Sequence, residues 1–192
     1  MLTVVKVGGG LARDAAALRS WCAGLAECGG RHPLLVVPGG GAFADAIRAH
    51  DRRFGLRDET AHWMAILAMD QFGWALADLI PGATLCRDLG PTRAGAVSVL
   101  LPHALLRERD PLPASWDVTA DSIAAWVAGA ACAGRLVLVK ATAGLDPAEV
   151  TDPYLPAALR EAGVEAWVIG REPERLAELL DTGRTAGSRV SA

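Results

Sequence analysis

Two runs of three glycines, each placed directly after a short apolar segment, constrain the fold of this chain more than any other feature. The first is Met1-Leu-Thr-Val-Val-Lys-Val-Gly-Gly-Gly10, and the second is Pro33-Leu-Leu-Val-Val-Pro-Gly-Gly-Gly41. Glycine after a buried strand lets backbone N–H groups approach an anion closely, and a helix that follows adds a partial positive charge. One such run alone would indicate only a tight strand-to-helix turn. The pair, together with Lys6, predicts a binding site for several phosphate groups.

Apolar and amphipathic segments alternate along most of the remaining sequence. We expect strands at residues 2–7, 34–37, 83–86, 96–100, 136–139, 166–169 and 187–190. We expect helices at residues 13–28, 43–50, 59–80, 119–132, 155–162 and 174–180, with residues 102–116 irregular. This order predicts an α/β fold with a mostly parallel sheet, in a single domain of 192 residues. Ligands in such folds bind at the carboxyl ends of the strands, where both glycine runs would lie.

Two helices carry further expectations. The pair Gly29-Gly30 is expected to end the first helix. Residues 59–80 are apolar on nearly every side of their helix, which indicates that it is either buried or shared with another subunit. We therefore expect this helix to line the ligand cleft on one side and to contact a second subunit on another, so that the chain would be a homo-oligomer.

The composition argues against several classes of protein. The net charge is −3 and no basic stripe is present, so a nucleic-acid partner is not expected. No apolar run is long enough to cross a bilayer, and the first residues resemble a strand rather than a signal peptide, so no membrane association is expected. The four cysteines form no C-x-x-C pair and no zinc-ligand spacing. Cys22, Cys28 and Cys132 are expected to be small buried residues in a reducing cytoplasm.

One segment matches a known nucleotide-binding pattern. Gly39-Gly-Gly-Ala-Phe-Ala44 fits the dinucleotide pattern G-x-G-x-x-G/A after a strand. The acidic partner of that pattern should end the next strand, whereas Asp58 and Glu59 open an expected helix, so the match is weak. The chain contains no P-loop sequence and no protein-kinase catalytic-loop signature.

Four charged residues lie near expected strand ends or helix starts, namely Lys6, Asp117, Asp121 and Lys140. Phosphoryl transfer requires in-line positioning and positive charge on the transferred group rather than covalent help from the protein. Two lysines with an aspartate between them, together with glycine N–H groups, would supply both. Each residue alone has a simpler explanation, since Lys140 could extend from a strand end into solvent and Asp121 could stabilise a helix N-terminus.

Several segments together resemble the amino acid kinase family in order and spacing. They are Lys6-Val-Gly-Gly-Gly10, Pro38-Gly-Gly-Gly41, Val118-Thr-Ala-Asp-Ser-Ile-Ala124, Lys140-Ala-Thr-Ala-Gly-Leu145 and the tail Val168-Ile-Gly-Arg-Glu-Pro-Glu-Arg-Leu176. The resemblance covers nearly the whole chain. It implies a three-layer α/β/α sandwich that uses ATP and Mg²⁺ to transfer the γ-phosphoryl group to a carboxylate or a phosphate.

The resemblance also implies roles for individual residues. Lys6 and Asp121 would be catalytic, Lys6 by steadying the transferred group and Asp121 by organising the site. The residues implied on the ATP side are Gly8, Gly9, Gly10, Lys140, Ala141 and Gly144. The residues implied on the acceptor side are Gly39, Gly40, Gly41, His62 and Asp117. The resemblance assigns no metal ligands.

Residues 58–73 look most like a small branch of the family that phosphorylates an (aminomethyl)furanmethyl phosphate to its diphosphate, in methanofuran-type cofactor synthesis. In isopentenyl phosphate kinases a histidine in this region meets the acceptor phosphate, and His62 could do likewise, although it could equally be an ordinary helix histidine. The ammonium group of such an acceptor would require a carboxylate, for which Asp58, Asp70 and Asp117 are candidates. Trp63 could stack on the furan ring, although a core position is the simpler interpretation.

The sequence also departs from the family pattern. Residues 141–143 lack the acidic residue that many members have there, and Arg171 and Arg175 occupy a region where some members have a phosphate-binding lysine. Three alternatives therefore stay open. They are a uridylate or isopentenyl phosphate kinase, a relative that binds a nucleotide or oxyanion without turnover, and a dinucleotide-dependent oxidoreductase.

Overall fold

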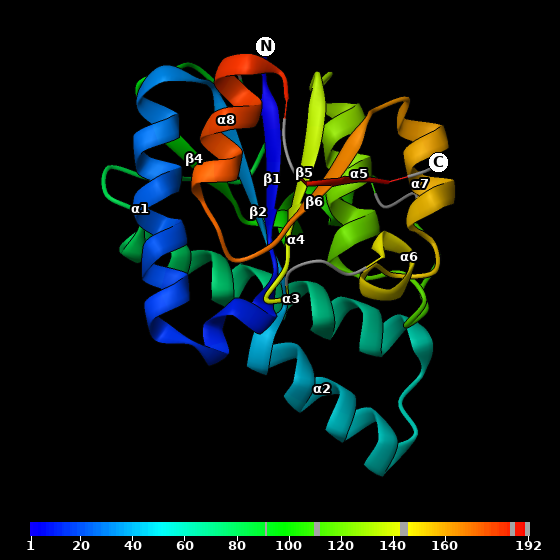
Figure 1. Cartoon of the computed structure of the whole chain (residues 1–192). Coiled ribbons are helices and arrows are strands. Elements are labelled where there is room, and N and C mark those ends of the chain that lie inside the picture. Colours follow the sequence, from blue (N-terminus) through cyan, green and yellow to red (C-terminus); the bar gives the residue numbers. More distant parts are fainter. Residues whose placement is uncertain (91, 110–111, 143–145, 185–186, 191–192) are drawn as a thin grey trace.

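The computed structural model describes residues 1–90, 92–109, 112–142, 146–184 and 187–190. Within these ranges one sheet of seven strands runs through the molecule in the order β3-β4-β2-β1-β5-β6-β7 (Figure 1). The strands are β1 (Thr3–Val7), β2 (Leu34–Pro38), β3 (Thr84–Cys86), β4 (Val97–Leu100), β5 (Arg135–Val139), β6 (Ala166–Ile169) and β7 (Ser188–Arg189). All neighbouring strands are parallel except β6 and β7, so the prediction of a mostly parallel sheet is confirmed.

Helices cover both faces of this sheet. The 3-10 helix η1 (Gly9–Arg13) is followed by α1 (Ala15–Arg31), α2 (Gly41–Phe54), α3 (Asp58–Leu79), α4 (Pro102–Arg109), α5 (Ala120–Ala130), α6 (Pro147–Val150), α7 (Leu155–Ala162) and α8 (Glu174–Thr182). In Figure 1, α1 and α8 lie on one side of the strands, and α5 and α7 lie on the other. The expected three-layer sandwich is therefore observed.

Two hydrophobic cores separate these layers, because the central strands are buried on both faces. Along β1, Val4 points into a cluster with residues of α5 and α7, whereas Val5 and Val7 point into a cluster with residues of α1 and α8. Strands enclosed on both sides in this way have continuous apolar runs rather than alternating ones. Lys6 is the exception in β1, and it is only 6% exposed.

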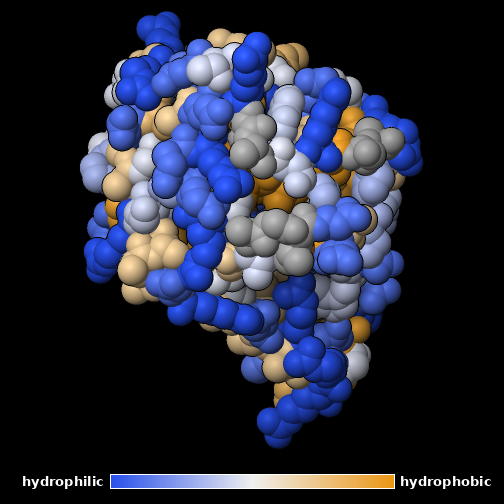
Figure 2. Space-filling view, viewed as in Figure 1, coloured by the Kyte–Doolittle hydropathy of each residue, from blue (hydrophilic) through white to orange (hydrophobic). Residues whose placement is uncertain are grey.

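Helices α2 and α3 lie below the carboxyl ends of the central strands in Figure 1. The two helices pack against each other, and α3 also packs on β2 and β4. Figure 2 shows mainly hydrophilic residues over the lower end of the molecule, where α2 lies in Figure 1. A polar helix therefore borders the edge of the sheet where a ligand would bind.

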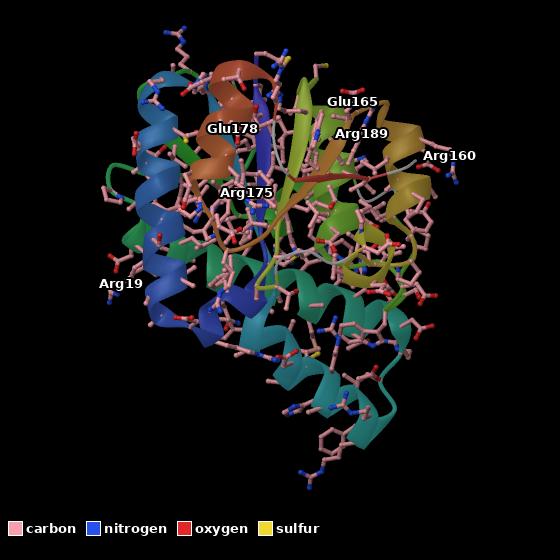
Figure 3. The ribbon with its side chains drawn as sticks, viewed as in Figure 1. Arg19, Arg160, Glu165, Arg175, Glu178 and Arg189 are labelled. Atoms are coloured by element: carbon pink, nitrogen blue, oxygen red, sulfur yellow. The ribbon has the colours of Figure 1, made fainter. Side chains whose placement is uncertain are left out.

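The last strand, β7, lies at the edge of the sheet next to β6. The Val190 N–H donates to the Ala166 carbonyl at 2.9 Å, which continues the antiparallel pairing of β7 with β6. The Arg189 guanidinium forms an ion pair with Glu165, and Figure 3 shows the two side chains beside each other above β6. The expected strand at residues 187–190 is thus present at Ser188–Arg189.

Two boundary predictions are wrong, for different physical reasons. Gly29-Gly30 does not end the first helix, which continues to Arg31. A Cβ at Gly29 would lie 2.4 Å from Val97 Cγ2, so this glycine lets α1 pack closely on β4 rather than stopping the helix. Residues 102–116 are not uniformly irregular, because Pro102 opens α4 and the Asp70 carboxylate accepts from the His103 N–H at 3.0 Å.

The cysteine prediction is partly wrong. Cys22 and Cys28 are buried, as expected, and burial raises the pKa of each thiol to about 11. Cys132 is exposed instead and has φ of 49°, because it lies just beyond α5, which ends at Ala130. No described helix is long and apolar enough to span a membrane.

Candidate active site

Lys6, Asp121 and Lys140 come together near the carboxyl edge of the sheet. Lys6 lies in β1, in register with Leu138 of β5, and Lys140 directly follows β5. Asp121 lies in the first turn of α5, which packs on β1. The Lys6 Nζ is 2.8 Å from Asp121 Oδ1, and the Lys140 Nζ donates to Asp121 Oδ2 at 2.5 Å. One buried carboxylate therefore lies between two ammonium groups.

Burial governs the protonation of this cluster. The side chains of Lys6, Asp121 and Lys140 are 7%, 4% and 13% exposed. Burial alone would raise the pKa of Asp121, but the ammonium groups of the two lysines hold it below its usual value. Burial and then repulsion from Lys6 lower the pKa of Lys140 to about 8, although attraction to Asp121 opposes the shift. With two cations and one anion, the charged cluster has one excess positive charge, which favours an anionic ligand.

The contact between Lys6 and Asp121 differs from the one made by Lys140. Among the described residues, Asp121 Oδ1 has no partner of hydrogen-bond geometry, although Lys6 Nζ lies within ion-pair distance. The short Nζ–Oδ1 distance and the opposite charges pair Lys6 with this carboxylate. Because an ammonium group has three N–H donors, Lys6 can contact Asp121 and a bound anion at the same time.

A second buried carboxylate fixes the helix that carries Asp121. Asp152, which is 7% exposed, accepts from the N–H and Oγ1 of Thr119 at 2.9 and 2.8 Å, from the Ser122 N–H at 3.0 Å, and from the Ser122 Oγ. Thr119 occupies the N-cap position of α5, but its side chain makes no capping bond. Asp152 supplies the capping acceptor from a distant segment, so sequence reasoning did not find it.

The two glycine turns lie against each other. A Cβ at Gly9 would lie 2.2 Å from both the Cα and N of Gly41, and a Cβ at Gly39 would lie 2.7 Å from the Gly9 N. A Cβ at Gly8 would lie 2.5 Å from the Val139 carbonyl oxygen. The glycines are required here because three backbone segments, after β1, β2 and β5, approach more closely than any side chain permits.

The glycine N–H groups fall into two sets. The Gly8 N–H donates to the Val139 carbonyl at 3.0 Å, and the Gly39 N–H donates to the Val7 carbonyl at 2.9 Å, so both hold the turns together. Gly9, Gly10, Gly40 and Gly41 stand at the starts of η1 and α2, where the first N–H groups have no intrahelical acceptor. Gly41, with φ of 55°, turns the chain into α2. This second set is the one able to bind an anion.

A cavity of about 210 Å³ opens beside these N–H groups. Its walls combine the glycine turns and Lys6 with residues of α2, α3 and α5. The lining residues are Lys6, Gly9, Gly10, Arg13, Gly39, Gly40, Gly41, Ala44, Asp45, Arg48, Ala65, Ile66, Met69, Trp116, Thr119, Ala120 and Ile123. The expectation that the apolar helix at 59–80 lines the cleft is confirmed by Ala65, Ile66 and Met69 of α3.

Four charged or aromatic lining residues, Arg13, Asp45, Arg48 and Trp116, were not identified from the sequence. Asp45 lies 3.2 Å from an Arg13 nitrogen and 3.5 Å from an Arg48 nitrogen. The Arg48 guanidinium stacks 4.6 Å from the centre of the Trp116 ring, and the Trp116 Nε1 donates to Asp51 Oδ2 at 2.7 Å. They escaped notice because only folding brings the first turn after β1, the middle of α2 and the segment before α5 together.

Other predicted residues lie farther from the cavity. His62 is 7% exposed, stacks edge-on against Trp63 and lines a small neighbouring cavity that shares Ala65 and Trp116 with the main one. Asp117 is exposed, and its carbonyl accepts from the Tyr154 N–H at 3.2 Å.

On the other side of the turns, Ala141 lies next to Gly10, because a Cβ at Gly10 would be 3.5 Å from the Ala141 Cβ. Gly144 lies outside the described residues.

The amino acid kinase family model matches residues 1–155. The chain belongs to the amino acid kinase family. The [5-(aminomethyl)furan-3-yl]methyl phosphate kinase of Methanocaldococcus jannaschii is 26% identical to this chain. The alignment covers 93% of this chain and 92% of the relative. The family resemblance inferred from the sequence motifs is thereby confirmed.

Solved structures of family members share the fold. Uridylate kinase from Archaeoglobus fulgidus superposes with a TM-score of 0.72 at 17% identity, covering 95% of this chain and 96% of that one. An isopentenyl phosphate kinase superposes with a TM-score of 0.64 at 15% identity, covering 99% of this chain and all of that one. This chain therefore shares their α/β/α sandwich over nearly its whole length.

Proposed function

We propose that this member of the amino acid kinase family transfers the γ-phosphoryl group of ATP to a small phosphomonoester, [5-(aminomethyl)furan-3-yl]methyl phosphate, and forms a diphosphate for methanofuran-type cofactor synthesis. The observation that carries the proposal is the buried Lys6–Asp121–Lys140 cluster at the meeting point of two glycine turns. Such a cluster provides positive charge and backbone donors at one point, which is what phosphoryl transfer requires.

The two turns would serve different ends of the transfer. Gly9 and Gly10, beside Ala141, would hold the phosphates of ATP. Gly40 and Gly41, at the start of α2, would hold the acceptor phosphate, because the cavity opens there. Lys6 lies between the turns and would stabilise the transferred group, while an acceptor oxygen attacks the γ-phosphorus in line and ADP leaves. Asp121 would keep the two lysines at a fixed separation.

The predicted role of Lys140 lies on the ATP side of the cluster. The Lys140 ammonium donates to Asp121, and Lys140 does not line the main cavity. Its charge would therefore act on the donor phosphates. Gly8 and Gly39 would contribute by shaping the turns, since their N–H groups are already bonded to backbone carbonyls.

Mg²⁺ would enter this site with the nucleotide. Among the described residues, no three His, Cys, Asp or Glu side chains gather as potential metal ligands, and both Asp121 oxygens face lysines. The residues present thus fit an ion carried by phosphate oxygens better than an ion held by a protein carboxylate cage. When bound, Mg²⁺ supplies neutralisation of the negative charge that develops on the phosphates.

The acceptor is assigned from the relative and from the cavity together. The Methanocaldococcus relative is named for an acceptor that joins a phosphate, a small ring and an amine, and it aligns with 93% of this chain. The cavity is small, lined by Lys6 and two arginines, and bordered by Trp116, which suits an acceptor of that size. Uridylate and isopentenyl phosphate are the alternative acceptors, because two proteins whose solved structures share the fold are named for these substrates.

We also propose that the chain works as a homo-oligomer of single-domain subunits in the cytoplasm. Leu67 and Trp74 are 42% and 57% exposed, and they lie seven residues apart, on one side of α3. Apolar side chains aligned on an exposed helix face favour association with a second copy. The buried free thiols of Cys22 and Cys28 suit a reducing compartment.

The proposal is tested by incubating the protein with MgATP and each candidate phosphate, and measuring ADP release. We expect turnover with the aminomethylfuran phosphate and much less with uridylate or isopentenyl phosphate. Faster turnover with either alternative would change the assigned acceptor. Nucleotide binding without ADP release from any acceptor would instead indicate a non-catalytic relative.

A further inference from the structure

We propose that Asp45 of α2 recognises the ammonium group of the acceptor and so selects amine-bearing phosphomonoesters over neutral ones. This inference rests on the proposed function and assigns a part of the acceptor that the catalytic cluster does not contact. It also replaces Asp58, Asp70 and Asp117, which the sequence offered as partners for the ammonium. Asp45 is the only carboxylate among the described residues that line the main cavity.

The other nearby carboxylates are either occupied or displaced from the cavity. Asp70 accepts from the His103 N–H at the start of α4, at 3.0 Å. Asp51 accepts from the Trp116 indole and from the Leu56 N–H, at 2.7 and 3.1 Å. These groups are used in holding the walls of the site.

The three remaining carboxylates are excluded on other grounds. The Asp121 side chain is only 4% exposed between two lysines, and it does not line the main cavity. Asp58 borders the small neighbouring cavity, and Asp117 is exposed on a loop. Asp45 is therefore the carboxylate that an acceptor in the main cavity can reach.

The position of Asp45 along α2 matches an acceptor held by its phosphate at the helix N-terminus. Asp45 follows Gly41 by four residues, about 6 Å along the axis, and Arg48 follows by seven, about 10 Å. A five-membered ring with a one-carbon arm on each side bridges a span of this order. The ring would then lie along the cavity wall that contains Trp116, and the ammonium would reach Asp45.

Among the described residues that line the main cavity, Asp45 supplies the single negative charge to which an ammonium group can be attracted. The cavity walls carry Lys6, Arg13 and Arg48 against the single carboxylate of Asp45. Arg13 and Arg48 both lie within ion-pair distance of Asp45, so its charge is retained and its oxygens are oriented. Because the Asp45 side chain is 51% exposed, its oxygens have lone pairs left for an ammonium group. A neutral acceptor would leave this carboxylate without the additional partner.

The test compares two acceptors that differ only at the amine, namely the aminomethylfuran phosphate and its hydroxymethyl counterpart. Wild-type protein and the Asp45→Asn, Asp58→Asn and Glu59→Gln variants are assayed for kcat/KM with each. Glu59 is an exposed carboxylate in the first turn of α3 and serves as the control. Thermal unfolding of every variant checks that it is folded.

We expect wild-type protein to prefer the amine about tenfold, as for a partly exposed charged hydrogen bond, and Asp45→Asn to remove that preference. The preference is taken as the ratio of the two kcat/KM values within each variant, so a general loss of activity does not affect it. An unchanged preference in Asp45→Asn, or its loss in Asp58→Asn instead, would overturn the inference while leaving the kinase proposal intact. Absence of turnover with both acceptors in wild-type protein would overturn the proposed function itself, and the inference with it.

Discussion

The buried carboxylate of Asp152 allows the organisation of the active site to be tested through a single substitution. In Asp152→Ala, the Thr119 and Ser122 N–H groups lose the acceptor that caps α5, which costs about 0.5–2 kcal/mol. The Ser122 hydroxyl, which is fully buried, also loses its partner, which costs about 1–3 kcal/mol. We expect the free energy of unfolding to fall by about 2–4 kcal/mol in total.

Asp146→Ala provides a matched control, because Asp146 is also an aspartate that caps a helix. It is exposed and accepts one bond, from the Ala148 N–H at 3.0 Å, at the start of the four-residue α6. Urea unfolding measures both variants, and the control should lose less than about 1 kcal/mol. In a protein of this length the loss in Asp152→Ala corresponds to a decrease in Tm of about 5–15 °C. Equal stabilities of the two variants would refute the capping role of Asp152.

The milder Asp152→Asn substitution distinguishes an effect of Asp152 on the pKa of Lys140 from an effect on folding stability alone. The negative charge of Asp152 contributes to raising the pKa of Lys140, so its removal should lower that pKa further. The alkaline limit of kcat/KM for ATP should then move to lower pH. A variant with reduced stability and an unchanged pH profile would show that Asp152 acts only on folding.

Three further predictions follow from the site and from α3. The pKa of Lys140 is about 8, and its protonated form is the one that attracts phosphates. We therefore expect kcat/KM for ATP to fall as pH rises through about 8. A flat profile from pH 7 to 9 would contradict this role. Gly9→Ala should destabilise the protein by about 2–4 kcal/mol in urea unfolding, because its Cβ would lie 2.2 Å from the Gly41 backbone. Gly10→Ala is the control: its Cβ would make an ordinary contact at 3.5 Å, so this variant should unfold like wild type. Trp74→Glu should yield monomers in light scattering without loss of stability, and persistence of the oligomer would place the subunit contact elsewhere.

The sequence predicted the central sheet well because its signals are local. The apolar runs before each glycine turn correspond to β1 and β2, and the run before Lys140 corresponds to β5. A lysine inside an apolar strand was an informative anomaly, since burying Lys6 requires a partner. The aspartate in the first turn of a downstream helix supplied that partner, so the Lys6–Asp121–Lys140 cluster could be anticipated from family spacing.

The features that the sequence did not reveal depend on contacts between distant segments. Asp152 lies 33 residues from Thr119, so no local cap pattern identified it. Gly29 looked like a helix stop because its role is close packing on Val97, which is visible only in three dimensions. Asp45 has no local signal in the sequence, because only folding brings it to the cavity that Trp116 also lines.

The most direct test of the account is ³¹P NMR of the protein with MgATP and [5-(aminomethyl)furan-3-yl]methyl phosphate, recorded for wild type and for Lys6→Ala. The account predicts that the acceptor monophosphate signal is replaced by two coupled diphosphate signals as ADP appears. It also predicts that Lys6→Ala, although still folded, forms product at least about 100-fold more slowly, the order of effect expected when a group that stabilises transition-state charge is removed. A wild-type protein that leaves the monophosphate unchanged, or a Lys6→Ala variant with near-normal turnover, would contradict the central claim.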